Sequence, residues 1–196
     1  MTACGELTMN KEKMIQKLKE KISDKRYEHS VGVSYTAACM AMVYGADIEA
    51  ARTAGLLHDC AKGLSTKEKL EKARKYGLPV NKYEETHPEM LHAKLGAYFA
   101  RYKFDITDNE ILDAITWHTT GRPDMSLLEK IIFVADYIEP NRKMIKDMEE
   151  IMREAFTDLD KCIVHILKNT IEYLESSMDD MDYMTKMTYE YYVNKN

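Results

Sequence analysis

The 196-residue sequence predicts one all-α domain, and three observations support this prediction. Apolar residues recur three and four positions apart, which is the spacing of an amphipathic helix. No segment alternates polar and apolar residues as a half-buried strand does. Only 8 glycines and 4 prolines interrupt the pattern. We therefore expect a flexible N-terminus over residues 1–9 and a single domain over residues 10–196, which includes a C-terminal helical extension.

Four helices are expected in the first half of the chain, and capping residues mark their ends. Gly45 ends the second helix, because glycine adopts the left-handed conformation of a helix C-terminus without steric cost. Asp47 is expected to cap the third. Ser65 and Glu68 form a capping box at the start of the fourth, which Gly77 ends. These helices are expected over residues 11–22, 30–43, 47–59 and 65–76.

The second half of the chain continues with helices after an expected loop at residues 80–88. Asp108 and Ser126 are side chains that suit the first position before a helix. Pro140 closes the apolar helix that Ser126 begins, because proline lacks the N–H group that a helix interior needs. These helices are expected over residues 90–102, 108–118 and 126–139, followed by two or three amphipathic helices to about Tyr192.

Composition and charge restrict the possible partners. The sequence has 28 Lys and Arg residues against 33 Asp and Glu residues, so no overall basic surface is expected for nucleic acid or an anionic membrane. No apolar run approaches the ~18 residues of a membrane span, and the first residues do not resemble a signal peptide. We expect a cytoplasmic protein with reduced, mostly buried thiols at Cys4, Cys39, Cys60 and Cys162.

The strongest local signal is the doublet His58-Asp59. It follows the apolar stretch 54–57, which predicts that the two side chains lie at the floor of a pocket. Neighbours on a helix diverge by about 100°, so the pair can straddle two metal ions. A carboxylate has two oxygens and can bridge two cations. Alone, the dipeptide is common enough to occur by chance.

Three more histidines and one aspartate extend the doublet into a possible ligand set. Asp136 directly follows the apolar run 131–135, and a carboxylate in such a run must be paired, protonated or bound to metal. Four imidazoles and two carboxylates suit two transition-metal ions that share Asp59. The predicted ligands are His29, His58, Asp59, His92, His118 and Asp136.

The order of these six residues resembles the HD-domain superfamily of metal-dependent phosphohydrolases. Longer strings resemble one bacterial branch, the YqeK family, over roughly residues 15–175. The strings are KRYEHSVGV at 25–33, AGLLHDCAK at 54–62, HAKLGA at 92–97, HTTG at 118–121 and ADYIEPNR at 135–142.

This resemblance implies an HD-domain helical fold and a specific hydrolase activity. Members of the YqeK family are symmetrical bis(5′-nucleosyl)-tetraphosphatases, which split diadenosine tetraphosphate into two ADP at a di-iron centre. The resemblance implies the same metal role for the six residues above, and a nucleotide substrate with ADP or GDP as product. The same ligands suit manganese, and zinc or nickel could occupy the site in a purified sample. The sequence leaves a homodimer open.

Two cationic residues are predicted to bind phosphate beside the metals and to assist catalysis. Lys62 lies one turn beyond the doublet and can act as a point charge. Arg142 follows Asp136 in a predicted turn, and its guanidinium suits two-point contact with a phosphate. The alternative for Lys62 is a solvated lysine at a helix end. Asp59 is the third predicted catalytic residue.

Two interpretations stay open for the remaining candidates. Thr119, Thr120 and Gly121 either offer hydroxyl and amide groups to a phosphate or simply form a helix C-terminus. His87 either protonates a leaving oxygen as a fourth catalytic residue or is a surface histidine of the 80–88 loop.

Two other functions fit the ligand set. One is a different HD phosphohydrolase, acting on nucleoside monophosphates or deoxynucleotides, against which the HTTG and IEPNR strings argue. The other is a non-enzymatic nucleotide-binding module, against which the completeness of the ligand set argues. Product analysis distinguishes the first alternative from a tetraphosphatase. A turnover assay with added metal distinguishes the second alternative from an enzyme.

Overall fold

The computed structural model describes residues 10–142, 146–177 and 180–195, and every regular element in these ranges is a helix. The all-α prediction is therefore confirmed. The N-terminal segment 1–9, predicted to be flexible and containing Cys4, lies outside the described residues. The elements are α1 Lys11–Lys19, α2 Asp24–Tyr44, α3 Ile48–Leu57, α4 Thr66–Lys75, α5 Lys82–Thr86, the 3-10 helix η1 Pro88–Leu91, α6 His92–Lys103, α7 Asn109–Trp117, α8 Leu127–Ile138, α9 Met148–Glu154, α10 Leu159–Ser177 and α11 Tyr183–Lys195.

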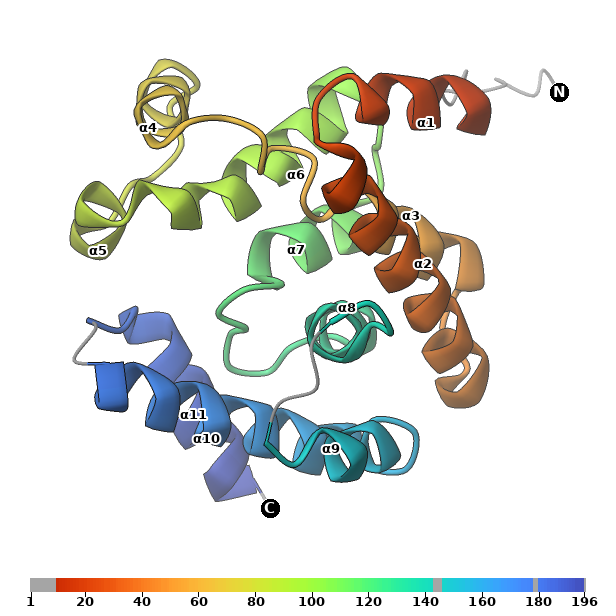
Figure 1. Ribbon diagram of the computed structural model, residues 1–196, viewed down its shortest axis with the longest axis vertical. Helices are drawn as coiled ribbons and strands as arrows, with labels where there is room; N and C mark the ends of the chain where they lie inside the picture. The colour runs from red at the N-terminus through yellow and green to blue at the C-terminus, as the bar shows by residue number, and fades with distance from the viewer. Residues whose placement is uncertain (1–9, 143–145, 178–179, 196) are drawn as a thin grey trace, which may run out of the picture.

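Helix α8 is the central element of the structure (Figure 1). It packs against α2, α3 and α7, and also against α9 and α10 of the C-terminal part. Its buried residues, from Leu128 to Ile138, occupy most of its circumference. A helix that is apolar nearly all round must be covered on all sides, which explains why the other helices surround it.

The predicted caps are present where the sequence indicated them. Asp47 accepts a hydrogen bond from the amide of Ala50, and Asp108 accepts one from the amide of Glu110. Complete capping boxes begin α4 at Ser65 and α8 at Ser126. The predicted stop at Gly45 is also confirmed, since this residue has φ +72°.

Two predicted helix boundaries and one predicted loop are wrong. The first helix ends at Lys19 and not at Ile22. The second begins at Asp24 and not at Ser30, because Ser23 accepts a hydrogen bond from the amide of Arg26 and so starts the helix earlier. Residues 80–88 are not a loop, since α5 and η1 lie there, and Asn81 forms a capping box for α5 with Glu84.

The C-terminal extension consists of three helices that pack beside α8 (Figure 1). Helix α10 packs on α8, and α11 packs on α10. Tyr192 of α11 is fully buried, and its hydroxyl accepts a hydrogen bond of 3.0 Å from the amide of Met125, just before α8. The tyrosine-rich end of the chain therefore packs on the body of the domain.

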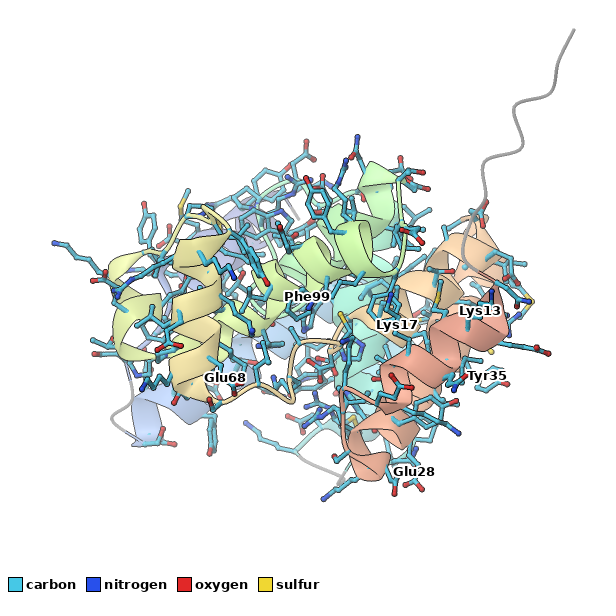
Figure 2. The ribbon with its side chains drawn as sticks, turned by 90° about the horizontal axis from the view of Figure 1, so that it is seen from above. Lys13, Lys17, Glu28, Tyr35, Glu68 and Phe99 are labelled. Atoms are coloured by element: carbon cyan, nitrogen blue, oxygen red, sulfur yellow. The ribbon has the colours of Figure 1, made fainter. Side chains whose placement is uncertain are left out.

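The view from above shows where single residues of the interior and the surface lie (Figure 2). Phe99 of α6 lies in the middle of the molecule and is only 2% exposed, whereas Lys13, Glu28 and Glu68 are exposed on the outside. In the part of the chain that the structure describes, no helix is long and apolar enough to cross a bilayer.

Candidate metal centre

The six predicted metal ligands come from five helices and meet in one place. His29 and Asp136 lie within α2 and α8, whereas His92 begins α6. His58 and His118 are the C-terminal caps of α3 and α7. Ends of helices therefore supply most of the cluster, which we call the histidine-aspartate cluster: His29, His58, Asp59, His92, His118 and Asp136.

Three of the imidazoles are oriented by their own helices. In each, Nδ1 lies close to the carbonyl oxygen three residues earlier in the chain, at 2.7 Å for His58, 2.6 Å for His92 and 2.7 Å for His118. A carbonyl oxygen can only accept, so Nδ1 carries a hydrogen, and in the neutral ring Nε2 then keeps its lone pair. This is the tautomer of an imidazole that binds a metal through Nε2.

The fourth imidazole is oriented by a carboxylate that the sequence analysis missed. Nδ1 of His29 lies 3.0 Å from Oε1 of Glu139, which is only 2% exposed. The other oxygen, Oε2, accepts hydrogen bonds from the amide and side chain of Asn141 at 2.9 and 3.2 Å. Gly32 makes room for this carboxylate, because a Cβ atom there would lie 2.4 Å from Oε2.

The two oxygens of Asp59 face different imidazoles. Oδ1 lies 3.2 Å from Nε2 of His92 and 3.7 Å from Nε2 of His118. Oδ2 lies 3.5 Å from Nε2 of His58 and 3.9 Å from Nε2 of His29. A carboxylate placed in this way can bridge two cations, each held by imidazoles from a different side.

The sixth residue, Asp136, closes the cluster from α8. Its Oδ1 lies 3.0 Å from Nε2 of His29 and 3.7 Å from Nε2 of His58. Ligand atoms of three overlapping groups of three residues lie within 4.8 Å of one another.

The buried polar atoms of the cluster fit metal ions. Nε2 of His29, Nε2 of His58 and Oδ1 of Asp59 are inaccessible to solvent and, within the described ranges, make no hydrogen bond of acceptable geometry, although Oδ1 of Asp136 lies 3.0 Å from Nε2 of His29. A buried polar atom without a partner is costly, and each of these is a common metal-ligand atom. The donor set and its orphaned atoms therefore support a divalent metal centre.

The electrostatics of the cluster prepare three of the ligands for metal. Burial alone would raise the pKa of Asp59, but His58 and His118 outweigh it and hold that pKa well below its usual range. The same holds for Asp136, where burial is outweighed by His29 and His58. Burial, reinforced by Lys62, holds the pKa of His92 well below its usual range. Both carboxylates are thus ionised and His92 is neutral at pH 7, as metal binding requires.

Three cationic side chains surround the cluster. Lys62, as predicted, lies beside it, with Nζ 3.1 Å from Nε2 of His92 and 3.8 Å from Oδ1 of Asp59. Arg142 also lies at the cluster, since its Nη2 is 2.9 Å from Oδ1 of Asp136. Arg26 was missed by the sequence analysis, yet its Nη1 lies 2.8 Å from Oδ2 of Asp59.

The HTTG segment divides between the cluster and the helix end. The hydroxyl of Thr119 lies 3.2 Å from Nε2 of His118 and 3.5 Å from Nε2 of His92. The hydroxyl of Thr120 instead donates to the carbonyl of Gly121. The amide of Gly121, at φ +63°, donates to the carbonyl of Trp117 and so completes the end of α7. The contacts thus place the hydroxyl of Thr119 at the cluster and give the amide of Gly121 a structural partner, and the substrate roles of Thr119, Thr120 and Gly121 stay predictions.

His87 is engaged with α5. Its ring stacks on that of Tyr83 at a centroid distance of 4.2 Å, and its Nδ1 lies 3.2 Å from the Tyr83 carbonyl. Within the described residues, no hydrogen bond or ion pair joins His87 to the histidine-aspartate cluster. The catalytic role predicted for His87 therefore has no support from these contacts and stays a prediction.

A cavity of about 420 Å³ adjoins the cluster between α5, α6 and the start of α11. We call it the α6–α11 cavity. Thr119 belongs both to this cavity and to the surroundings of the metal ligands. Its other walls include Tyr83, Met90 and Trp117, which offer apolar surface, and the ion pair between Lys94 and Glu84 at 2.8 Å.

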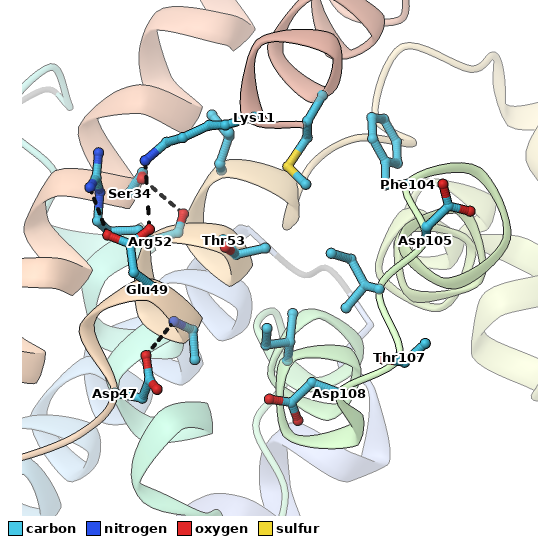
Figure 3. A pocket seen from close by; sticks show the side chains of 15 residues that line it. Lys11, Ser34, Asp47, Glu49, Arg52, Thr53, Phe104, Asp105, Thr107 and Asp108 are labelled. Carbon is cyan, nitrogen blue, oxygen red and sulfur yellow. Dashed lines mark hydrogen bonds and ion pairs between the residues drawn. The ribbon is translucent and has the colours of Figure 1, made fainter. Parts of the chain in front are cut away.

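A second cavity, of about 410 Å³, contains none of the predicted site residues (Figure 3). It lies between α1, α3 and the connection from α6 to α7. Most of its charged groups already have structural partners: Glu49 pairs with Arg52 at 2.9 Å and with Lys11 at 3.6 Å, and Asp47 caps α3. We therefore assign it no part in the chemistry of the cluster.

Comparison with known proteins identifies the class that this fold and cluster define. The HD domain family matches residues 26–141, more than half of the chain, and this range contains all six predicted ligands. The structure of an HD superfamily hydrolase from Clostridium acetobutylicum, described as involved in NAD metabolism, is 37% identical. It superposes with a TM-score of 0.92 over 95% of this chain and 98% of that one.

Two relatives narrow the assignment. The symmetrical bis(5′-nucleosyl)-tetraphosphatase of Halalkalibacterium halodurans is 43% identical over 85% of this chain and 88% of its own length. That of Bacillus subtilis is 38% identical over 95% of this chain and 99% of its own length. The chain belongs to the HD domain family, in the branch of symmetrical bis(5′-nucleosyl)-tetraphosphatases.

Proposed function

We propose that the protein hydrolyses diadenosine tetraphosphate symmetrically, giving two ADP. The observation that carries this proposal is the complete cluster of four imidazoles and two carboxylates in a chain 43% identical to an enzyme of that name. The comparisons favour this activity over a nucleoside monophosphatase or a non-catalytic nucleotide-binding module, since the named relatives cover nearly the whole chain.

We propose iron as the metal, with manganese as a substitute. The six cluster residues would hold two ions, with Asp59 between them. Two such ions, when bound, lower the pKa of water and neutralise charge on phosphate oxygens. The imidazole-rich donor set suits iron, manganese and zinc, so the identity of the metal must be measured.

The residues around the cluster would hold the polyphosphate. Lys62, Arg26 and Arg142 surround the carboxylates, and a metal that neutralises Asp59 and Asp136 leaves their donors available for phosphate oxygens. The hydroxyl of Thr119, which lies 3.2 Å from Nε2 of His118, would contact the same phosphates. One nucleoside would lie in the α6–α11 cavity, between Trp117 and Tyr83. A nucleoside held in this cavity would determine which phosphorus faces the metals, and hence which bond of the polyphosphate is cut.

We further propose a cytoplasmic enzyme. Cys39, Cys60 and Cys162 are all free thiols, which fits a reducing compartment. Burial raises the pKa of Cys60 to about 12, so this thiol next to Asp59 stays protonated and serves packing. A homodimer stays a prediction.

The test is chromatographic product analysis on diadenosine tetraphosphate, diadenosine triphosphate, NAD and AMP, with metal content measured on the same sample. Two ADP per tetraphosphate is the expected result, and water labelled with oxygen-18 should mark one of the two. ATP plus AMP, or faster release of phosphate from AMP, would overturn the proposal. Asp59→Asn should abolish turnover and deplete metal, because the neutral amide is a poor bridge between two cations.

A further inference from the structure

A further cavity, of about 610 Å³, lies between the end of α8 and the second half of α10. We call it the α8–α10 cavity. It shares no lining residue with the α6–α11 cavity. Its walls include Tyr137, Arg142, Lys146, Asn169 and Tyr173. None of these residues, apart from Arg142, has been given a role by the chemistry described so far.

Arg142 connects this cavity to the histidine-aspartate cluster. Its side chain lines the cavity, and its Nη2 lies 2.9 Å from Oδ1 of Asp136. Tyr137, the residue after Asp136, lines the cavity as well. A guanidinium has five N–H donors, and the bond to Asp136 uses one nitrogen. A phosphate chain that leaves the cluster along Arg142 therefore reaches the α8–α10 cavity.

The walls suit a nucleoside. The Tyr173 side chain is 68% exposed, so its ring offers a face on which a base can stack. Asn169 adds a side-chain amide, whose Nδ2 donates to the carbonyl of Lys146 at 3.5 Å and whose oxygen can accept from a base edge or a ribose. Lys146 is paired with Glu172 at 3.3 Å, so Arg142 supplies the positive charge at the side facing the cluster.

We propose that the α8–α10 cavity binds the second nucleoside of a dinucleoside polyphosphate, with Tyr173 stacked on its base. This inference rests on the proposed function and deepens it. A substrate with a nucleoside at each end needs a seat for both, and the α6–α11 cavity supplies only one. With Arg142 at the boundary, the scissile bond lies between two seats, and a symmetrical cut leaves a nucleoside diphosphate in each.

The test compares two substrates that differ only in the second nucleoside. KM and kcat are measured for diadenosine tetraphosphate and for adenosine 5′-tetraphosphate. If adenosine 5′-tetraphosphate is not cleaved, its inhibition constant is measured instead. Tyr173→Ala should raise KM for the dinucleotide roughly 5- to 100-fold, the range that stacking of one base supports. The constants for the mononucleotide should not change. Tyr173→Phe, which keeps the ring, should keep the wild-type KM.

The matched control is Tyr102→Ala, since Tyr102 is 65% exposed on α6 and lines neither nucleoside cavity. It should leave both substrates unaffected. The inference is overturned if Tyr173→Ala leaves the KM for the dinucleotide unchanged, or weakens both substrates equally. If the wild-type protein gives no ADP from the dinucleotide, the proposed function itself fails. Thermal unfolding of each variant excludes loss of the fold.

Discussion

At the scale of single residues, the contact between His29 and Glu139 links an acidic side chain to the metal ligands without making it one of them. A carboxylate that accepts from Nδ1 fixes the ring and raises the basicity of Nε2. Gly32 allows this contact, since any Cβ there would meet the carboxylate. Glycine at position 32 therefore supports the metal centre indirectly, because it leaves room for the carboxylate that orients His29.

We expect Gly32→Ala to weaken metal binding and, because buried polar groups lose their partners, to lower stability by about 1 to 3 kcal/mol. The new methyl group displaces the flexible end of Glu139, so His29 loses its partner while the helices keep their packing. Loss of such a contact lowers metal affinity roughly 10- to 100-fold. Metal titration followed by urea unfolding measures both effects. Glu139→Gln should behave similarly, and unchanged affinity in both variants would contradict this role.

Arg142→Lys should lower kcat/KM for the tetraphosphate while metal content stays at the wild-type level. Lysine keeps the positive charge but loses the planar arrangement of donors that grips two phosphate oxygens. Steady-state kinetics at subsaturating substrate, with metal analysis of the same sample, give the answer. Full activity in that regime would exclude Arg142 as a phosphate ligand.

At the scale of elements, α2 and α3 approach closely where they carry two of the metal ligands. A Cβ at Gly55 would lie 2.9 Å from Cα of Ser34, a backbone atom that cannot yield as a side chain does. The carbonyl of Gly55 also accepts the hydrogen bond from Nδ1 of His58. The spacing of the two helices and the orientation of one ligand therefore depend on the same glycine.

Gly55→Ala should cost about 1 to 3 kcal/mol of stability, the usual penalty for overpacking, and should also reduce metal affinity. Gly45→Ala is the matched control. At φ +72° it pays about 1 kcal/mol for the left-handed conformation, but nothing lies within 4 Å of its Cβ. Chemical unfolding and metal titration should show lower stability and lower metal affinity for Gly55→Ala. For Gly45→Ala they should show lower stability alone.

The sequence predicted most elements because their caps are local signals, and the failures have local causes. Ile22 is buried although it lies beyond α1, so the apolar stripe continued past the last helical hydrogen bond. The first turn of α2 is mostly polar, so no apolar periodicity indicated that the helix begins at Asp24, after its cap Ser23. Helix α5 has five residues, too few to show any periodicity.

The cluster was predictable from the sequence, but its supporting contacts were not. The six ligands carry a recognisable order of residue types. Glu139 lies 110 positions from His29, and nothing in the sequence alone pairs them. Arg26 lay inside one of the quoted strings, yet only the fold shows that it reaches Asp59. The two nucleoside cavities depend on α10 and α11, whose sequences lie mostly outside the motifs.

At the scale of the whole molecule, a buried charged group joins α9 to α10 in the C-terminal extension. Glu154 at the end of α9 is only 5% exposed and pairs with Lys161 at 2.9 Å and with His165 at 3.0 Å. Burial acts to raise the pKa of Glu154, but these two partners outweigh it and lower the pKa from its ordinary value of 4.5. His165 is thus a structural histidine of the extension.

This lowered pKa predicts the pH dependence of stability. The unfolded chain binds a proton at Glu154 more readily than the folded one, so the contribution is present above pH 4.5 and is lost as the pH falls through the folded pKa. Glu154→Gln should therefore destabilise the protein at pH 7 and differ little from wild type near pH 3. Glu175→Gln, an exposed change on α10, is the control. A difference in stability between Glu154→Gln and wild type that grows on acidification would contradict the assignment.

The position of α11 has a consequence for biosynthesis. All six ligands of the histidine-aspartate cluster precede residue 137, whereas one wall of the α6–α11 cavity begins at Met181. At ribosomal rates of about 5 to 20 residues per second, that wall is translated seconds after the last ligand. The ligand-bearing segment is therefore available to metal before the nucleoside seat exists. On the proposed assignment, the nascent chain would present its metal ligands first and would complete the α6–α11 cavity only when α11 docks.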